Sequence, residues 1–263
     1  MTKVIGLITR DLPGIGDKLV VSSFPENIYK NTGNKVIDVD NCRVFDYNPY
    51  VLRQAEYEVG MRHEDICALF NYKNVTKPFI SFPERAVLGL GLEKVYLRNP
   101  RLYAYEDATQ EKKICLHSSG SSKDRHIPQE AIANILDRYP YHEIIQIGYK
   151  KDIPLSEKFP RIIDRTSEKS VDAAFWETAY EIATCEIYIG IDSGWVHMAN
   201  AYNRVRKKIF LNYGEDLLEN FVPNVMNPNP SLPVFSNPWF DFNWEYYNTF
   251  KRDIGVTRSY IHI

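Results

Sequence analysis

Short apolar runs alternate with amphipathic segments along much of the chain, and this alternation predicts its secondary structure. The apolar run Lys3–Thr9 predicts a strand, residues 11–17 form a turn rich in Pro and Gly, and Lys18–Asn31 has a helical pattern. The β-branched run Lys35–Val39, bounded by Asn and Gly, predicts a second buried strand. The chain is therefore expected to open with a strand–helix–strand unit.

The middle of the chain is harder to interpret. Between Tyr50 and Tyr72 the pattern is mixed and predicts helix, although the periodicity is weak. The polar and charged stretch Tyr103–Lys113 is the best candidate for a linker between two domains. We therefore expect residues 1–108 to form an N-terminal domain and residues 109–263 to form a C-terminal domain.

The second half of the chain alternates more clearly. Strands are expected at residues 113–117, 143–148, 161–164, 186–191 and 207–212, and helices at residues 128–139, 172–184 and 194–202. Such alternation predicts a parallel sheet with helices on both faces. The fold class predicted for the whole chain is α/β, and the second half is the clearer Rossmann-like domain. Pro and Asn dominate residues 223–238, and an aromatic segment, residues 239–250, follows.

Composition and charge narrow the class of protein. The 263 residues are 44% hydrophobic and 25% charged, which is typical of a globular chain. Thirty-two basic against thirty-four acidic residues give a net charge of -2, so no global field attracts nucleic acid or an anionic membrane. No apolar run reaches the 18 residues that a membrane helix needs, and the N-terminal apolar run is too short for a signal peptide. We expect a cytoplasmic protein without membrane insertion.

The cysteines argue against a zinc site or a disulfide framework. The four are far apart in the sequence and form no CxxC pair. We expect them to be reduced, and we expect no metal and no cofactor. They are Cys42, Cys67, Cys115 and Cys185.

In an open α/β sheet, ligands gather at the carboxyl ends of the strands, and three loops there have suitable composition. The first loop contains Gly14, Gly16 and Asp17. The glycines allow a ligand to approach the backbone, and Asp17 has two interpretations, a cap of the following helix or a general base. Because a free Asp has a pKa of about 3.9, a base role needs close positioning and some desolvation.

The second loop follows the strand that ends at His117. Its small and hydroxyl residues, including Ser118, Ser119 and Gly120, provide N–H and O–H donors. Basic residues near its end, Arg125 among them, suit a phosphate or diphosphate. A solvated polar surface loop is the equally weighted alternative.

The third loop runs directly from a buried strand into a helix. Asp192, Ser193 and Gly194 lie at this junction, and His197 lies one turn further in. The free N–H groups at the helix start can bind an anion. Asp192 and Ser193 are also ordinary capping residues, and a His in a helix is more often a core residue. An anion site is nevertheless the favoured interpretation, because the first two loops would converge on this one.

Together these loops resemble glycosyltransferase family 9, the ADP-heptose:lipopolysaccharide heptosyltransferase group. The resemblance rests on Gly14-x-Gly-Asp17, on the Ser-Gly loop ending in a basic residue, His and Pro128, and on Gly190-x-Asp-Ser-Gly-x-x-His197-x-x-Ala. The last motif is the most specific. The similarity covers the N-terminal loop and most of residues 113–213.

The resemblance implies the GT-B fold, with two Rossmann-like domains facing across a cleft. It implies a first domain that binds the acceptor and a second domain that binds a nucleotide-diphosphate sugar. The C-terminal tail is expected to cross back to the first domain. It makes Asp17 the base that deprotonates the acceptor and places Arg125 at the donor diphosphate. The family's phosphate-binding turn corresponds to Asp192, Ser193 and Gly194, and the histidine beside that turn corresponds to His197. Such enzymes invert the anomeric centre and typically need no metal.

The acceptor and the exact activity stay open. Family members are usually longer, and the missing length falls mainly in the first domain, where the acceptor binds. A surface glycan, a small molecule, a protein or a modified base in DNA are all candidate acceptors. A sugar-nucleotide epimerase or a non-catalytic nucleotide-sugar-binding relative is the alternative. An NAD-dependent oxidoreductase is disfavoured because no Gly-x-Gly-x-x-Gly is present.

The aromatic segment near the C-terminus, residues 239–250, also has two interpretations. Exposed aromatic rings can stack on sugars or unpaired bases. Packing between the domains uses the same residue types and is the favoured interpretation. The basic cluster Arg204–Lys208 is expected to be a solvated turn.

Overall fold

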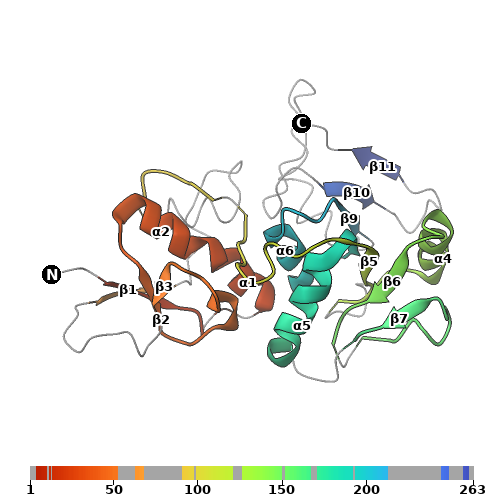
Figure 1. Cartoon of the computed structure of the whole chain (residues 1–263), viewed down its shortest axis with the longest axis horizontal. Helices are drawn as coiled ribbons and strands as arrows, with labels where there is room; N and C mark the ends of the chain where they lie inside the picture. Colours follow the sequence, from red (N-terminus) through yellow and green to blue (C-terminus); the bar gives the residue numbers. More distant parts are fainter. Residues whose placement is uncertain are drawn as a thin grey trace.

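The computed structural model describes most of both halves of the chain. The residues that it describes are 4–10, 12, 14–52, 63–67, 91–97, 99–120, 126–149, 152–166, 171–191, 193–212, 244–248 and 257–260. They form two lobes, each built on its own sheet (Figure 1). The α/β fold class expected from the alternating pattern is therefore confirmed.

The first lobe contains a parallel sheet whose strand order is β3-β2-β1-β4 in the described residues. Its strands are β1 (Val4–Ile8), β2 (Val36–Asp38), β3 (Val51–Leu52) and β4 (His63–Cys67). All of the pairings are parallel, and β1 lies between β2 and β4. The strand–helix–strand opening is thus confirmed.

One expected helix of this lobe is interrupted. The segment forms α1 (Ile15–Val20), a 3-10 turn η1 (Val21–Ser23) and α2 (Phe24–Thr32). Pro25 lies in the first turn of α2, where its missing N–H costs least. Proline therefore favours the start of a new helix here over the continuation of α1.

The expected helix between Tyr50 and Tyr72 is wrong for the residues that the structure describes there. Val51–Leu52 pairs with β2, and His63–Cys67 pairs along its whole length with β1. The sequence signal was weak because β4 carries three polar residues, His63, Glu64 and Asp65. Backbone pairing with a central strand decides the conformation, so tertiary context overrides the local pattern.

The second lobe contains a larger sheet, whose strand order in the described residues is β11-β10-β9-β8-β5-β6-β7. The strands that follow the expected alternation are β5 (Glu111–His117), β6 (Glu143–Gln146), β7 (Ile162–Asp164), β8 (Cys185–Gly190) and β9 (Lys207–Asn212). They pair in parallel. The helices are α4 (Gln129–Arg138), α5 (Val171–Thr184) and α6 (Gly194–Ala201).

Alternate residues of the central strand pack on opposite faces of this sheet. Ile114 and Leu116 of β5 belong to an apolar cluster with Ile132 of α4, whereas Cys115 belongs to a second cluster with Phe175 of α5. This period of two is the geometry of a strand that is covered on both sides. The expectation of helices on both faces is therefore confirmed.

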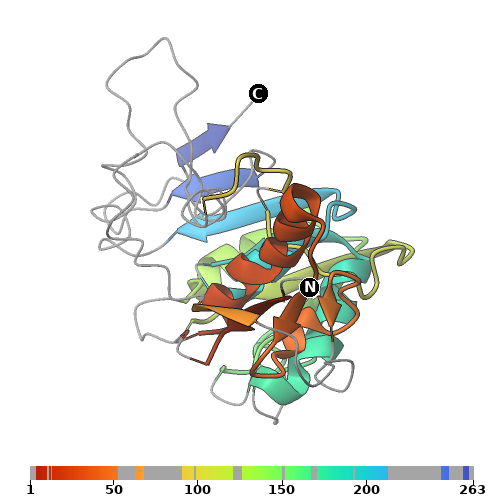
Figure 2. The same cartoon turned by 90° about the vertical axis from the view of Figure 1, so that its left-hand side faces the viewer.

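The aromatic segment contributes a strand to the second sheet. Strand β10 (Trp244–Asn248) pairs in parallel with β9, and β11 (Thr257–Tyr260) pairs antiparallel with β10 (Figure 2). The described part of the tail therefore extends the second lobe. Of the tail residues 223–250, on which the expected return towards the first lobe rests, 244–248 join the second sheet and the others lie outside the described residues.

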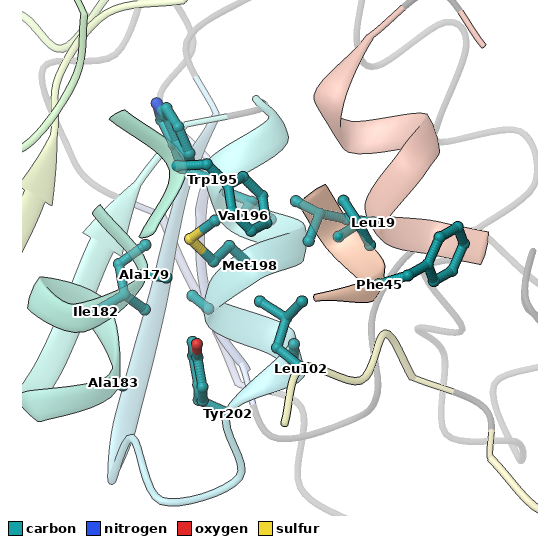
Figure 3. Close-up of a cluster of buried hydrophobic side chains, with 14 of the residues drawn as sticks. Leu19, Phe45, Leu102, Ala179, Ile182, Ala183, Trp195, Val196, Met198 and Tyr202 are labelled. Carbon is teal, nitrogen blue, oxygen red and sulfur yellow. The ribbon is translucent and has the colours of Figure 1, made fainter. Parts of the chain in front are cut away.

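A continuous apolar core joins the two lobes. Leu19 of α1 faces Val196 and Met198 of α6, with Leu102 beside them (Figure 3). Phe45 of the 3-10 turn η2 (Arg43–Phe45) belongs to the same core on the far side of Leu19. Every side chain from Trp195 to Ala201 is buried. Helix α6 is thus enclosed by its own sheet on one side and by the first lobe on the other.

The segment expected to link the domains contacts both lobes. Tyr103 donates to Glu26 of α2, and just before the segment the backbone N–H of Arg101 donates to Ser22 of η1. Ala104 accepts a hydrogen bond from Tyr202, which follows α6. The exact boundary at residue 108 stays a prediction. Among the described residues, no helix is both long enough and apolar enough to cross a membrane.

Candidate nucleotide-binding and catalytic site

Two of the three candidate loops meet at the centre of the second sheet. Strands β5 and β8 are neighbours, with His117 paired to Gly190 at their carboxyl ends. From this pair the strand order runs outward to β6 and β7 on one side and to β9 on the other. Such a reversal of direction opens a crevice at the carboxyl edge of a parallel sheet, where ligands bind.

The first candidate loop joins this place from the other lobe. Helices α1 and α6 pack against each other through glycine, and Figure 1 shows both helices where the two lobes meet. A Cβ added at Gly194 would overlap the Ile15 side chain and lie 3.0 Å from the backbone N of Gly16. The two N-terminal turns are therefore in backbone contact, and glycine at these positions is what allows it.

Asp17 lies on this turn of α1, and its surroundings bear on both of its interpretations, as a helix cap and as a general base. Its carboxylate Oδ2 accepts a hydrogen bond of 3.1 Å from the N–H of Gly14, so Gly14 is the N-cap of α1 and Asp17 closes a capping box from within the first turn. Burial raises the pKa of Asp17 above its ordinary value, and hydrogen bonds from backbone N–H groups oppose that shift. The carboxylate is thus fixed in place and more basic than a free Asp, as a general base requires.

His197 packs its ring against the same turn. A Cβ on Gly16 would lie 3.1 Å from His197 Cδ2, and the side chain of His197 is buried. Burial lowers the pKa of His197 to about 4. The imidazole is therefore neutral at pH 7, so it can act through hydrogen bonds but carries no charge for an anion.

The second candidate loop turns partly inward. Ser118 is buried, and its Oγ accepts from Nε2 of Gln146 at 3.2 Å. Ser119 forms an isolated antiparallel bridge with His126, and Gly120 follows at the partly exposed edge. Ser118 is thus placed to hold the loop, whereas Ser119 and Gly120 remain the candidates for ligand contact. Arg125 lies outside the described residues.

The third candidate loop holds an unusual serine. Ser193 precedes α6 but makes no side-chain hydrogen bond to the N–H groups of its helix. Its Oγ instead lies 3.0 Å from Nδ1 of His117. The N–H of Val196 donates to the Ser193 carbonyl at 3.2 Å, and the N–H groups before it take no bond from the Ser193 hydroxyl, which is the arrangement of an anion site. Asp192 lies outside the described residues.

On its far side His117 faces Asp152, but its Nε2 makes no hydrogen bond there. Its Nε2 lies 3.6 Å from Oδ2 of Asp152, and both side chains are almost completely buried, with exposures of 1% and 2%. The N–H of Tyr149 donates to the same carboxylate oxygen at 2.9 Å. Ser193, His117 and Asp152 thus lie in a line from the ligand edge into the second lobe.

Sequence reasoning assigned no role to His117 or Asp152. The signal for His117 was available, since a polar residue ends the buried run Ile114–Leu116 at the carboxyl edge of a central strand. Asp152 gave no comparable signal, because its approach depends on how the loop after β6 folds back. Within the described residues, no group of three or more His, Cys, Asp or Glu side chains is arranged to hold a metal ion.

Comparison with solved structures identifies the fold of the chain. A family 9 glycosyltransferase from Veillonella parvula matches over 94% of this chain and 86% of its own, with a TM-score of 0.61 at 13% sequence identity. Escherichia coli ADP-heptose lipopolysaccharide heptosyltransferase II matches over 94% and 90%, with a TM-score of 0.56 at 14% identity. The chain therefore has the GT-B fold of glycosyltransferases.

A third structure points to the same group. The E. coli heptosyltransferase WaaC with ADP matches 80% of this chain and 87% of its own, with a TM-score of 0.53 at 13% identity. No family model and no curated protein sequence matches the chain. The resemblance to glycosyltransferase family 9 that the three loops carry is thus confirmed at the level of the fold.

Proposed function

We propose that this protein is an inverting, metal-independent glycosyltransferase that moves a sugar from a nucleotide-diphosphate sugar to an acceptor hydroxyl. The observation that carries the proposal is the contact between the N-terminal turns of α1 and α6. It brings the turn that holds Asp17 against the turn that follows Ser193. A candidate base and a candidate anion site are thereby joined across two lobes.

The reaction that these residues support is a single displacement. The acceptor hydroxyl attacks the anomeric carbon while Asp17 accepts its proton, and the bond from that carbon to the diphosphate oxygen breaks. One displacement inverts the anomeric configuration. The raised pKa of Asp17 supports this role, because it makes the carboxylate a better proton acceptor.

The second lobe supports the leaving group. The nucleoside diphosphate departs with an additional negative charge, which the N–H groups at the start of α6 and the hydroxyl of Ser193 can stabilise. Ser119, Gly120 and, from the sequence motif, Arg125 and Asp192 complete the proposed phosphate contacts. Because these donors provide the stabilisation, the reaction needs no metal ion and no cofactor.

The donor class is supported by the structural neighbours, whose names include ADP and ADP-heptose. We propose a nucleotide sugar of this general class as donor. The acceptor is a hydroxyl of a glycan or small molecule, and a modified DNA base belongs to the same chemical class.

The test is an assay of purified full chain with ADP-, UDP-, GDP-, CDP- and dTDP-sugars in EDTA, followed by nuclear magnetic resonance. We expect release of nucleoside diphosphate that depends on an acceptor, here a bacterial core oligosaccharide, a monosaccharide mixture or hydroxymethylated DNA. An inverted anomeric signal in the product is the expected stereochemistry. Conversion of the donor alone into its epimer would instead identify an epimerase, and retention of configuration would contradict the single displacement.

A further inference from the structure

Ser193 has the backbone of a helix cap without the side-chain bond of one. Its φ of -163° and ψ of 171° give the extended conformation that an N-cap residue adopts. Serine is preferred at this position because its hydroxyl accepts from the N–H of the second or third residue of the helix. Ser193 makes no such bond to α6. Another group therefore holds its hydroxyl in a different direction.

His117 is the group that holds it. His117 ends β5 level with Gly190 of β8, and Ser193 follows Gly190 by three residues, so the register of the two central strands brings them together. Nδ1 of His117 lies 3.0 Å from the Ser193 Oγ, while Nε2 of the same ring makes no hydrogen bond. The ring is only 1% exposed, so its surroundings fix it in place. The contact orients the Ser193 hydroxyl whichever of the two atoms carries the hydrogen.

The direction of the Ser193 hydroxyl decides which N–H groups of α6 can serve a ligand. The N–H of Val196 already donates to the Ser193 carbonyl at 3.2 Å. A serine that capped the helix would therefore take the N–H of Trp195, the second residue of α6. That N–H, with the N–H of Gly194, is a donor that a phosphate oxygen needs at a helix start. A capping serine and a bound phosphate thus compete for the same group.

Resting on the proposed function, we propose that His117 is a positioning residue that holds the Ser193 hydroxyl away from the start of α6 and so keeps the N–H groups of Gly194 and Trp195 available to the donor diphosphate. His117 touches no ligand in this scheme and acts through Ser193 alone. The serine gives up the bond of an ordinary cap, and the diphosphate takes its place. A buried imidazole with one unpartnered nitrogen is costly, and this role explains why it is kept.

Two substitutions at His117 separate its two nitrogens. The side-chain amide of His117→Asn occupies the position of Nδ1 and keeps a partner for Ser193, whereas that of His117→Gln occupies the position of Nε2 and loses it. The full chain is titrated by isothermal calorimetry in EDTA, with whichever of ADP, UDP, GDP, CDP and dTDP binds the wild type most tightly. We expect His117→Gln to weaken binding by about 2- to 30-fold, the equivalent of one N-cap bond. His117→Asn should restore most of the affinity.

A double-mutant cycle with Ser193→Ala shows whether His117 acts through the serine. Alanine cannot cap α6, so His117→Gln should change affinity less than about twofold in that background. The nucleoside of the same base, measured by competition, carries no phosphate, and its affinity should not respond to His117→Gln. The matched control is His142→Gln, because His142 also faces a carboxylate, that of Glu186 at 3.4 Å, but lies before β6 at the opposite edge of the sheet. It should bind as the wild type does.

The outcomes separate this inference from the proposed function. A loss in His117→Gln that His117→Asn restores and that disappears in the Ser193→Ala background supports the positioning role. Wild-type affinity in folded His117→Gln, or a loss of equal size in both backgrounds or for the nucleoside, would overturn that role and leave the proposed transferase intact. Melting curves establish folding, and His117→Leu, which also lacks the Nδ1 contact, replaces His117→Gln if the latter does not fold. No binding of any of the five diphosphates by the wild type would overturn both.

Discussion

At the residue scale, Asp17 combines a structural and a chemical role. Its carboxylate caps α1 through Gly14, and the same burial that holds it there raises its pKa. A raised pKa in a carboxylate means that folding favours its protonated form. Stability from this group is therefore present below the unfolded value of 3.8 and is lost as the pH rises through the higher folded value. At neutral pH, keeping the Asp17 carboxylate ionised therefore lowers the stability of the folded chain.

Asp17→Asn therefore separates catalysis from folding. Asparagine can accept the same hydrogen bond from Gly14 but cannot take a proton, so we expect kcat to fall by about 10²-fold or more. We expect the thermal midpoint at pH 7 to stay the same or to rise. Steady-state kinetics and a melting curve on the same preparation provide the check. A folded Asp17→Asn enzyme with near-normal turnover would exclude Asp17 as the base.

His197 gives a prediction about acid stability. Its pKa is about 4 in the folded chain, below the ordinary 6.5, because burial disfavours the charged ring. The folded state binds fewer protons than the unfolded state between these values, so stability is full above about pH 6.5 and falls as the pH drops towards 4. The loss should approach about 3 kcal/mol at the lower limit.

Urea unfolding at pH 7, 6 and 5 compares the wild type with His197→Gln, which does not titrate. We expect the unfolding free energy of the wild type to fall more steeply towards acid than that of the variant. Parallel pH dependences in the two proteins would contradict the buried, neutral state of His197.

The chemistry of single residues was only partly predictable from sequence. The expectation that a base at Asp17 needs burial agrees with the direction of its pKa, because the first turn of α1 is packed against α6 and burial raises the pKa. The expected contact of His197 with the diphosphate stays a proposal, since the structure places its ring on Gly16. His117 and Asp152 were missed as a pair, because they come from different strand ends and only the sheet order brings them together.

At the element scale, the contact of α1 with α6 depends on the absence of side chains. Gly194→Ala would push a Cβ into the Ile15 side chain and to 3.0 Å from the backbone of Gly16, which cannot move aside as a side chain can. We expect a loss of about 1–3 kcal/mol in unfolding free energy and weaker nucleotide binding. Gly14→Ala is the milder comparison, since its Cβ would lie 3.2 Å from a side-chain oxygen of Asp17 and 4.0 Å from the backbone N of Gly16. Equal melting temperatures for the two variants would contradict the backbone contact.

Elements with strong periodicity were predictable, and those set by pairing were not. The expected helix at residues 172–184 and the strand at 186–191 agree with α5 and β8 to within a residue. Strand β4 was missed because its polar residues gave no alternating pattern, and only its position beside β1 makes it a strand. The break between α1 and α2 was missed although Pro25 provided a local signal.

At the scale of the whole molecule, the lobes are joined by polar as well as apolar contacts. Trp176 of α5 donates its indole N–H to Asp46 of the first lobe at 2.9 Å, and the rings of Tyr47 and Tyr105 pack edge-on against Trp176. These contacts fix the relative position of the two lobes on which the α1–α6 contact depends. The proposed site is therefore a property of both lobes together.

Trp176→Phe keeps the ring packing and removes the hydrogen bond to Asp46. We expect a loss of about 1–2 kcal/mol in unfolding free energy, because the bond involves a charged acceptor. Tyr180→Phe, on the same helix at an exposed position, should leave stability within about 0.5 kcal/mol of wild type. A double-mutant cycle with Asp46→Asn checks the assignment, and strictly additive effects would contradict it.

The central claim is that the joined lobes form a nucleotide-diphosphate site that works without metal. The most direct test is a thermal-shift titration of the full chain in EDTA with ADP, UDP, GDP, CDP and dTDP and their common sugar conjugates. At a ligand concentration of 100 times Kd, binding adds about 2.7 kcal/mol, which raises the midpoint by roughly 5–10 °C. We predict a selective rise with one nucleotide and its sugars, whereas no shift with any of them would contradict the account.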